Sequence, residues 1–240
     1  MKIQLLAFAS ARDAIGSDQA SLTLPEGSTL SDLRDVLQAQ YPDLEPLWPR
    51  LAIAVEGELA PPSSLLRDGV EVALLPPVSG GAPSEGGRER GSLEARVGLV
   101  EDAIDVPGLL ATLKAPSCGA VLLFLGTVRD HHQGRPVVRL TYSAYRSMAE
   151  SRLLAITREL EAASSNLRLG IVHRLGEVPV GEPSVAIASA SPHREEAYEG
   201  NRLLLERLKA EVPIWKREHY GDGEAAWREE ESLLAPSSAL

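Results

Sequence analysis

The sequence predicts an α+β protein made of two folded modules joined by a flexible linker. The chain has 240 residues, 44% of them apolar and 24% charged, which is typical of folded proteins and long enough for two ordinary domains. Residues 79–96 (SGGAPSEGGRERGSLEAR) are rich in Gly, Ser, Pro and charge and lack apolar periodicity, as linkers do. Strand-like and helix-like patterns lie on both sides of this stretch. We therefore divide the chain into a domain at 1–81, a linker at 82–96 and a domain at 97–240.

The first domain has the pattern of a small sheet crossed by one helix. Pro25-Glu26-Gly27 forms a turn, and Ser28 can cap a helix that carries Leu30, Leu33, Val36 and Leu37 on one side. The alternating and turn-bounded segments predict strands at 2–9, 20–24, 51–56 and 70–75. This arrangement is the ubiquitin-like β-grasp layout.

The second domain alternates helices and strands in a different order. Its patterns predict a short helix at 106–114, a strongly apolar buried strand at 118–128 and a polar loop from Arg129 to Arg135. A strand, a helix, two strands and a long helix follow, at 137–145, 147–164, 168–175, 184–190 and 192–211. Pro213 ends the long helix, and a last strand and a short acidic helix complete the pattern.

Charge and cysteine content exclude several classes of function. The formal charge of −10 argues against binding to nucleic acid, whose phosphates require a basic surface. Cys118 is the single cysteine, so no internal disulfide or multi-cysteine metal site can form, and a reducing cytoplasm is the expected location. No run approaches the roughly 20 apolar residues of a membrane span. Gln4 interrupts the apolar start MKIQLLAFASA, which therefore fits a first strand better than a signal peptide.

The first domain ends in a segment suited to projecting into another protein. In LLPPVSGG (residues 74–81), two prolines cannot fold back, and the two final glycines can pass through a channel too narrow for a Cβ. Gly80-Gly81 alone could equally be a generic linker. After a β-grasp pattern and two prolines, the pair favours a carrier whose terminal carboxylate enters one enzyme to be activated and another to react.

Two lysines flank the corner between the long helix and the last strand. Only 4 of the 24 basic residues are lysines, and two of them, Lys209 and Lys216, lie in LKAEVPIWKRE on either side of Pro213. Arginine provides permanent positive charge, whereas lysine can also act as acid, base or nucleophile. The alternative is that both are ordinary solvated surface residues.

Two further segments suggest an anion site. In Ser191-Pro192-His193-Arg194, the serine can cap a helix and the proline suits its first turn, so His193 and Arg194 lie where free backbone amides favour an anion. A well-capped helix without a ligand would show the same pattern. In FLGTVRDH (124–131), a strand releases Arg129 into a polar loop, a usual place for a binding residue. His131 and His132 have no accompanying ligand pattern for a metal, and the segment 173–177 fits a structural strand and turn.

These segments together resemble the two subunits of molybdopterin synthase. Residues 1–81, with KIQLLAFASARD and LLPPVSGG, resemble the small sulfur-carrier subunit, and LKAEVPIWKRE, Ser191 to Arg194 and FLGTVRDH resemble the large catalytic subunit. The resemblance implies a β-grasp domain linked to an α/β hammerhead-type catalytic domain. It makes Gly81 the bearer of a thiocarboxylate, Lys209 and Lys216 the catalytic lysines, and Arg129, His193 and Arg194 the substrate-binding residues.

The resemblance also implies a reaction and its partners. A sulfurtransferase of this family converts cyclic pyranopterin monophosphate to the dithiolene molybdopterin with sulfur from the carrier tail, which a separate adenylating enzyme activates. No bound cofactor or metal is expected. Two rival hypotheses are a non-catalytic ubiquitin-like carrier with a docking domain, and an enzyme that gives sulfur to another acceptor. One departure is that Glu231 stands where the family tends to have a functional arginine, with Arg228 the nearest substitute.

Two expectations concern assembly. Arg194 and Lys209 lie 15 residues apart on one predicted helix, which separates their backbones by roughly 22 Å. If both serve one site, the expected arrangement is a homodimer through the catalytic domain, with shared sites. Fusion also locks the Gly81 carboxyl in a peptide bond to Ala82, so cleavage between them is expected before sulfur can be carried.

Overall fold

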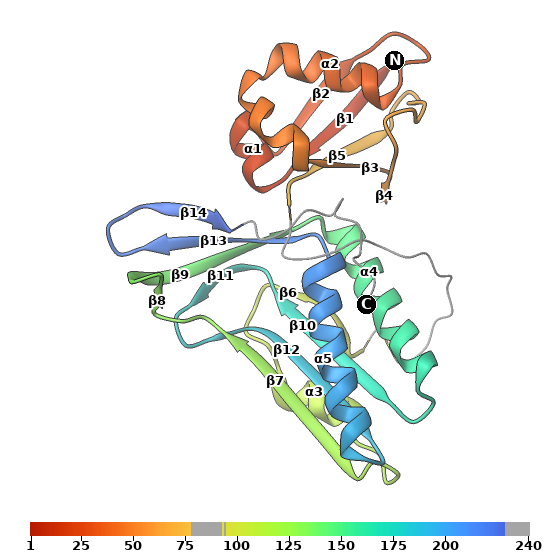
Figure 1. Ribbon diagram of the computed structural model, residues 1–240, viewed down its shortest axis with the longest axis vertical. Helices are drawn as coiled ribbons and strands as arrows, with labels where there is room; N and C mark the ends of the chain where they lie inside the picture. Colours follow the sequence, from red (N-terminus) through yellow and green to blue (C-terminus); the bar gives the residue numbers. More distant parts are fainter. Residues whose placement is uncertain (78–92, 94, 229–240) are drawn as a thin grey trace. The chain divides into compact units, whose positions relative to one another are not determined.

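The computed structural model describes residues 1–77, 93 and 95–228, which form two compact units divided near residue 82 (Figure 1). Each unit combines helices with sheets, so the predicted α+β class is confirmed. Most of the predicted linker, and Gly81, lie outside the described residues. Within the described residues, no helix has the length and apolarity needed to cross a membrane.

The first unit is the predicted β-grasp module. Its sheet has the order β2-β1-β5-β3-β4, with β1 and β5 parallel and the other pairs antiparallel. Helix α2 (Leu30–Gln40) buries Leu30, Leu33 and Leu37 in the core against this sheet. The strands are β1 Lys2–Ala7, β2 Gln19–Thr23, β3 Ala52–Val55, β4 Glu58–Leu59 and β5 Glu71–Leu75.

This unit differs from the sequence prediction in three respects. Thr29, not Ser28, is the N-cap of α2: its hydroxyl accepts from the backbone N–H of Asp32, whose carboxylate accepts in return from the N–H of Thr29. The Ser28 hydroxyl instead donates to the carbonyl of Pro25. The predicted first strand is also too long, since residues after Ala7 turn into α1 (Ala9–Ile15), and η1 (Pro42–Arg50) was not predicted.

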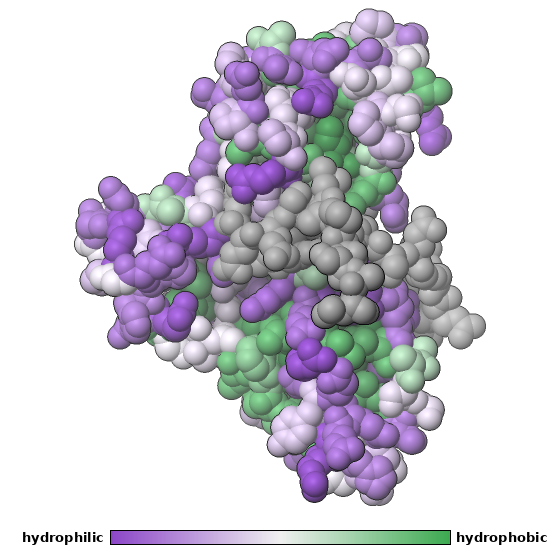
Figure 2. All heavy atoms as spheres, in the orientation of Figure 1, coloured by the Kyte–Doolittle hydropathy of each residue, from purple (hydrophilic) through white to green (hydrophobic). Residues whose placement is uncertain are grey.

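The second unit contains a four-stranded sheet with helices on both faces. The sheet has the order β6-β10-β12-β7. Leu169 and Ile171 of β10 and Val185 and Ile187 of β12 pack under α4 and α5, whereas the alanines of β12 face α3. The elements are β6 Val97–Val100, α3 Val106–Leu113, β7 Ala120–Thr127, α4 Arg146–Ala163, β10 Arg168–Arg174, β12 Pro183–Ser191 and α5 Arg194–Glu211. Figure 2 shows a mainly hydrophilic surface over α5, where Arg202 pairs with Glu199 and Glu206 at 2.7 and 2.8 Å.

A second sheet carries the end of the described chain. It has the order β11-β9-β13-β14, and the short β8 pairs with β9. The strand β14 was not predicted, and the short acidic helix expected to finish the chain extends into residues beyond 228, which lie outside the described ones. The strands β6, β8 and β11 were also not predicted from the sequence. The strands of this sheet are β8 His131–His132, β9 Arg135–Ala144, β11 Gly176–Pro179, β13 Ile214–Tyr220 and β14 Ala225–Arg228.

Strand β7 is an edge strand, and not the buried strand that its apolar sequence predicts. Among the described residues it pairs with β12 alone. Every second side chain is exposed, and the exposed fractions of Val121, Leu123 and Leu125 are 42%, 40% and 39%. An apolar run is compatible both with a central strand and with an edge strand that another protein surface covers. The sequence pattern therefore cannot distinguish the two.

Arg96, the last residue of the expected linker, already belongs to packed structure. Its guanidinium is 5% exposed and donates to Glu161 of α4 and to the carbonyl of Leu169 on β10, both at 2.6 Å. The carbonyl of Arg96 also accepts from the backbone N–H of Ile171. The fold of the second unit therefore includes residue 96.

Candidate functional site

The two predicted lysines lie at one corner of the second unit. Helix α5 ends at Glu211, Val212 caps it, and β13 begins at Ile214 after Pro213. Lys209 is exposed in the last turn of α5, where a positive charge favours the helix dipole. Lys216 is half-buried in β13. The corner thus presents both amines within one short stretch of chain.

A buried network of ion pairs fixes the helix end that carries Lys209. Glu211 accepts from Arg152 of α4 and, at 2.6 Å, from Arg207 one turn earlier. Arg207 also pairs with Glu159 of α4 at 2.7 Å. Arg152 and Glu211 are less than 9% exposed, so removing one partner would leave a buried charge at large cost. The network therefore holds the last turn of α5 against α4.

The strand register places Lys216 between two polar neighbours. It lies opposite Tyr142 on β9 and opposite Arg228 on β14. Because side chains alternate along a strand, Lys216, Glu218 and Tyr220 share one face of the sheet. Lys216 was predicted from the sequence but Glu218 and Tyr220 were not, although their spacing of two residues along the strand was a usable signal.

Glu218 is the centre of a cluster on that face. Its carboxylate is 5% exposed and accepts from the Tyr220 hydroxyl at 2.7 Å and from Nε of Arg228 at 2.9 Å. Nδ1 of His132 lies 3.2 Å from the other carboxylate oxygen. Burial alone would raise the pKa of Glu218, but the hydrogen bonds from Tyr220 and Arg228 and the charges of Arg228 and His132 bring its pKa below the ordinary value. The carboxylate is therefore ionised at neutral pH.

Arg129 emerges beside the same sheet. Val128 is buried in a cluster with Leu140 and Tyr220, and the next residue, Arg129, is exposed. The carbonyl of Asp130 accepts from the backbone N–H of Val137 at 2.8 Å, which ties the loop to β9. Arg129 thus emerges beside the sheet that carries Lys216 and the Glu218 cluster, near Tyr220 at the end of β13.

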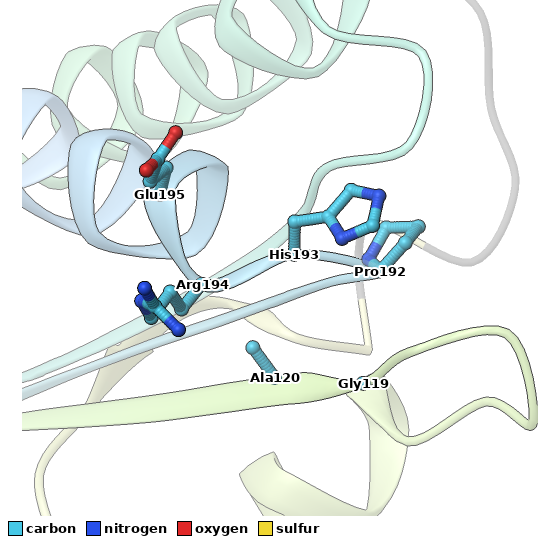
Figure 3. A pocket seen from close by; sticks show the side chains of 6 residues that line it. All are labelled: Gly119, Ala120, Pro192, His193, Arg194 and Glu195. Carbon is cyan, nitrogen blue, oxygen red and sulfur yellow. The ribbon is translucent and has the colours of Figure 1, made fainter.

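His193 and Arg194 lie together at the other end of α5. They line a hollow of about 490 Å³ with Gly119, Ala120, Pro192 and Glu195. In Figure 3, the Arg194 guanidinium and the Glu195 carboxylate point in different directions from the start of α5. The backbone of Gly119 lies so close to Pro192 that a Cβ at residue 119 would be 2.6 Å from the Pro192 carbonyl oxygen.

The start of α5 differs from the predicted cap. The N-cap is His193, without a side-chain hydrogen bond, and Arg194 is the first helical residue. Ser191 still belongs to β12, and its hydroxyl donates to the carbonyl of His193 in place of accepting from the helix. Pro192 therefore precedes the helix. The first amides of α5 are not occupied by a serine cap, which leaves them available to the hollow.

The two groups of predicted residues do not meet within one subunit. Helix α5 is continuous from Arg194 to Glu211. The 15-residue separation of Arg194 and Lys209 therefore corresponds to about 22 Å along the axis. Gly81, the remaining predicted catalytic residue, lies outside the described residues.

Two other side chains, those of His173 and Cys118, pack within the fold of the second unit. His173, in the segment predicted to be structural, is 6% exposed in β10, and its ring contacts that of Tyr142 edge-on at 4.9 Å. Burial lowers the pKa of His173 to about 4. Cys118 is half-buried just before β7 and packs against the alanine-lined core of β12.

Known proteins resemble both units. The family model of the MoaE protein matches residues 99–211, and that of the ThiS family matches residues 5–81. The molybdopterin synthase catalytic subunit of Oryza sativa subsp. indica is 46% identical over 131 residues, covering 55% of this chain and 67% of the relative. That of Culex quinquefasciatus is 46% identical over 134 residues, covering 55% and 85%.

A solved structure agrees with these matches. The molybdopterin synthase from Staphylococcus aureus is 33% identical, with a TM-score of 0.53, and the match covers 58% of this chain and 98% of that one. The chain therefore belongs to the molybdopterin synthase family: an enzyme of molybdenum cofactor biosynthesis in which a catalytic-subunit region and a ThiS-family sulfur-carrier region share one polypeptide.

Proposed function

We propose that this chain is a sulfurtransferase that converts cyclic pyranopterin monophosphate to the dithiolene molybdopterin. Sulfur arrives as a thiocarboxylate on Gly81 of the carrier domain, residues 1–81, and the catalytic domain, residues 97–240, transfers it. The observation that supports the proposal is the lysine corner, the segment from Lys209 to Lys216. Lys209 lies in the last turn of α5, and Lys216 lies on β13 two residues before the buried carboxylate Glu218.

Each lysine has a separate task in the proposed reaction. Lys209, exposed on the helix end, holds or attacks the terminal carbonyl of the carrier tail, which must arrive from solvent. Lys216, half-buried on the sheet, assists proton transfer to and from the reacting sulfur and the pterin. Arg129, at the edge of the same sheet, binds the substrate.

The hollow at the start of α5 suits the substrate's phosphate. His193 and Arg194 line it, and the first amides of an 18-residue helix supply N–H donors and the positive end of its dipole. A cyclic phosphate carries a negative charge at neutral pH and fits this combination. No metal or bound nucleotide enters the proposed reaction.

A second copy of the chain would bring the hollow toward Arg129, beside the sheet that carries Lys216. Strand β7 begins at Ala120, which lines the hollow, and ends at Thr127, two residues before Arg129. Antiparallel pairing of two β7 edges about a two-fold axis places the start of one strand beside the end of the other. The partner subunit's His193 and Arg194 then lie near Arg129, and the exposed Val121, Leu123 and Leu125 become covered.

The fused carrier requires a cut before it can work. The Gly81 carboxyl forms an amide with Ala82, and an amide has no acidic oxygen for adenylation. Cleavage between Gly81 and Ala82 frees that carboxyl, and a separate adenylating enzyme then activates it. The partners proposed are thus this enzyme, the pterin substrate and a second copy of the chain, in the cytoplasm, without nucleic acid or membrane.

The test is molybdopterin formation by variants of Lys209. Residues 1–81 carrying a thiocarboxylate are mixed with residues 82–240 and cyclic pyranopterin monophosphate, and the product is measured by mass spectrometry. We expect Lys209→Ala to abolish product, and Lys114→Ala, at the end of α3, to change little. If Lys209→Ala is as active as the control, Lys209 does not have the proposed role. If the wild-type mixture forms no product, the chain is a carrier with a docking domain and not a synthase. Detection of a sulfurated acceptor other than the pterin would indicate that the enzyme serves a different sulfur pathway.

A further inference from the structure

Lys216 faces a second cation, Arg228, which has no part in the proposed catalysis by Lys209 and Lys216. Arg228 lies directly opposite it across the β13–β14 pair, so both side chains leave the same face of the sheet. Like charges directly opposite each other destabilise a sheet. Glu218, on the same face, accepts from Arg228 and offsets one of the two charges, and an anionic reactant can offset the other.

The structure holds the Arg228 guanidinium in one orientation. Nε donates to Glu218 at 2.9 Å, and Nη2 donates to the Tyr220 hydroxyl, which itself donates to Glu218 at 2.7 Å. Tyr220 is further fixed by Arg135, whose guanidinium stacks on its ring at 3.8 Å. The side chain of Arg228 is 25% exposed, and no partner for Nη1 is recorded in the part of the chain that is described. One edge of the guanidinium is thus anchored while another can meet a ligand.

We propose that Arg228 is a further anion-binding residue of the synthase site, where it holds a reactant oxyanion beside Lys216. The inference rests on the proposed function. Glu218 and Tyr220 are its positioning residues, since they touch Arg228 and not the reactant. A guanidinium binds planar carboxylates and phosphates through paired N–H donors. Two reactants offer such a group: the carbonyl end of the carrier tail and the phosphate of the pterin.

The oxyanion of the carrier tail and that of the pterin can be told apart by kinetics. Steady-state rates are measured with residues 1–81 carrying the thiocarboxylate, varying this carrier at saturating pterin and then the reverse. For Arg228→Gln we expect the KM of one reactant to rise about 10- to 100-fold, the range for losing a hydrogen bond to a charged group, with a much smaller change in the other KM. The reactant whose KM rises is the one whose anion Arg228 binds.

The matched control is Arg139→Gln. Arg139 lies on β9 opposite His219, hence on the other face of the same sheet, and pairs with Glu177 at 3.0 Å. This substitution removes the same charge and should leave both KM values within about twofold. Arg228→Lys keeps the charge without the paired donors, so we expect a smaller rise, about 3- to 10-fold, in the same KM.

A second variant keeps the inference testable if Arg228→Gln fails to fold. Tyr220→Phe retains the ring under Arg135 and the Arg228 charge, and removes only the hydroxyl that orients Nη2. We expect the KM affected in Arg228→Lys to rise about 3- to 10-fold. If Arg228→Lys and Tyr220→Phe lower only the melting temperature and leave both KM values unchanged, Arg228 is structural and the inference is wrong. If the wild-type chain itself forms no molybdopterin, the proposed function has failed instead.

Discussion

At the residue scale, a substitution at Lys216 can distinguish the effect of its positive charge from the effect of proton transfer. Lys216→Arg keeps a positive charge opposite Tyr142 and Arg228 but replaces an amine, which can serve as acid or base, with a guanidinium, which supplies only charge. We expect a loss of rate of about 10² to 10³, within the range of general acid–base catalysis, with an unchanged melting curve. The measurement is single-turnover molybdopterin formation.

Its control is the neighbouring side chain on the other face of β13. Arg217 lies opposite Trp227 and Thr141, and its guanidinium stands 5.6 Å from the Trp227 ring centre. Arg217→Lys changes the same kind of side chain in the same strand and should retain most of the rate. Near-normal turnover by Lys216→Arg would show that Lys216 acts only as a charge.

His173 gives a prediction for stability against pH. Its pKa is about 4 when folded and 6.5 as an ordinary histidine, so the unfolded chain binds the proton more strongly between those values. Stability contributed by the neutral ring is complete above pH 6.5 and is lost as the pH falls toward 4, by about 3 kcal/mol in total. In His173→Gln, which has no ring to protonate, the free energy of unfolding should fall less between pH 7 and 4.5. Urea titrations at both pH values measure it, and an equal fall in both proteins would contradict the assignment.

At the element scale, the exposed edge strand β7 predicts that two copies of the chain form a dimer. Its exposed valine and leucines are covered if two copies pair edge to edge. We expect the full chain to sediment as a dimer and Leu123→Lys to sediment as a folded monomer. Val138, 48% exposed on β9, supplies the control, since Val138→Lys should remain dimeric. A wild-type monomer at tens of micromolar would exclude the proposed pairing.

Shared sites make a further prediction about mixed dimers. Arg194→Ala removes a side chain from the hollow, and Lys209→Ala removes one from the lysine corner at the other end of α5. If each site combines the hollow of one copy with the corner of the other, exchange of subunits between the two inactive variants should restore part of the activity. Mixing that restores none, although mass spectrometry shows mixed dimers, would place both residues in separate sites.

The elements also show what the sequence could predict. Strong periodicity was sufficient for α2, α4 and α5, and the chain of turn signals located the β-grasp strands. The Thr29 cap was readable from Asp32 three residues later, but Ser28 looked equally suitable. The β13 alternation could have identified Glu218 and Tyr220. Their link to Arg228 depends on pairing with β14, and their link to His132 on a contact between segments far apart in the chain, which no local pattern contains.

At the scale of the whole molecule, the proposed function implies that fusion supplies both subunits in equal amounts and leaves the carrier blocked until the chain is cut after Gly81. The catalytic unit should survive a cut after Gly81, because its fold begins near Arg96, whose buried pair with Glu161 is independent of the carrier. The cut therefore frees the tail without removing any described contact of the catalytic unit.

The most direct test of this account compares uncut and separated chains. Full-length protein, shown by intact mass to be uncut, and a mixture of residues 1–81 and 82–240 are each supplied with the adenylating enzyme, a sulfur donor, ATP and cyclic pyranopterin monophosphate. The account predicts molybdopterin from the separated pieces, with a thiocarboxylate on Gly81 by mass, and none from the uncut chain. Equal product from the uncut chain would show that Gly81 is not the sulfur carrier of this protein.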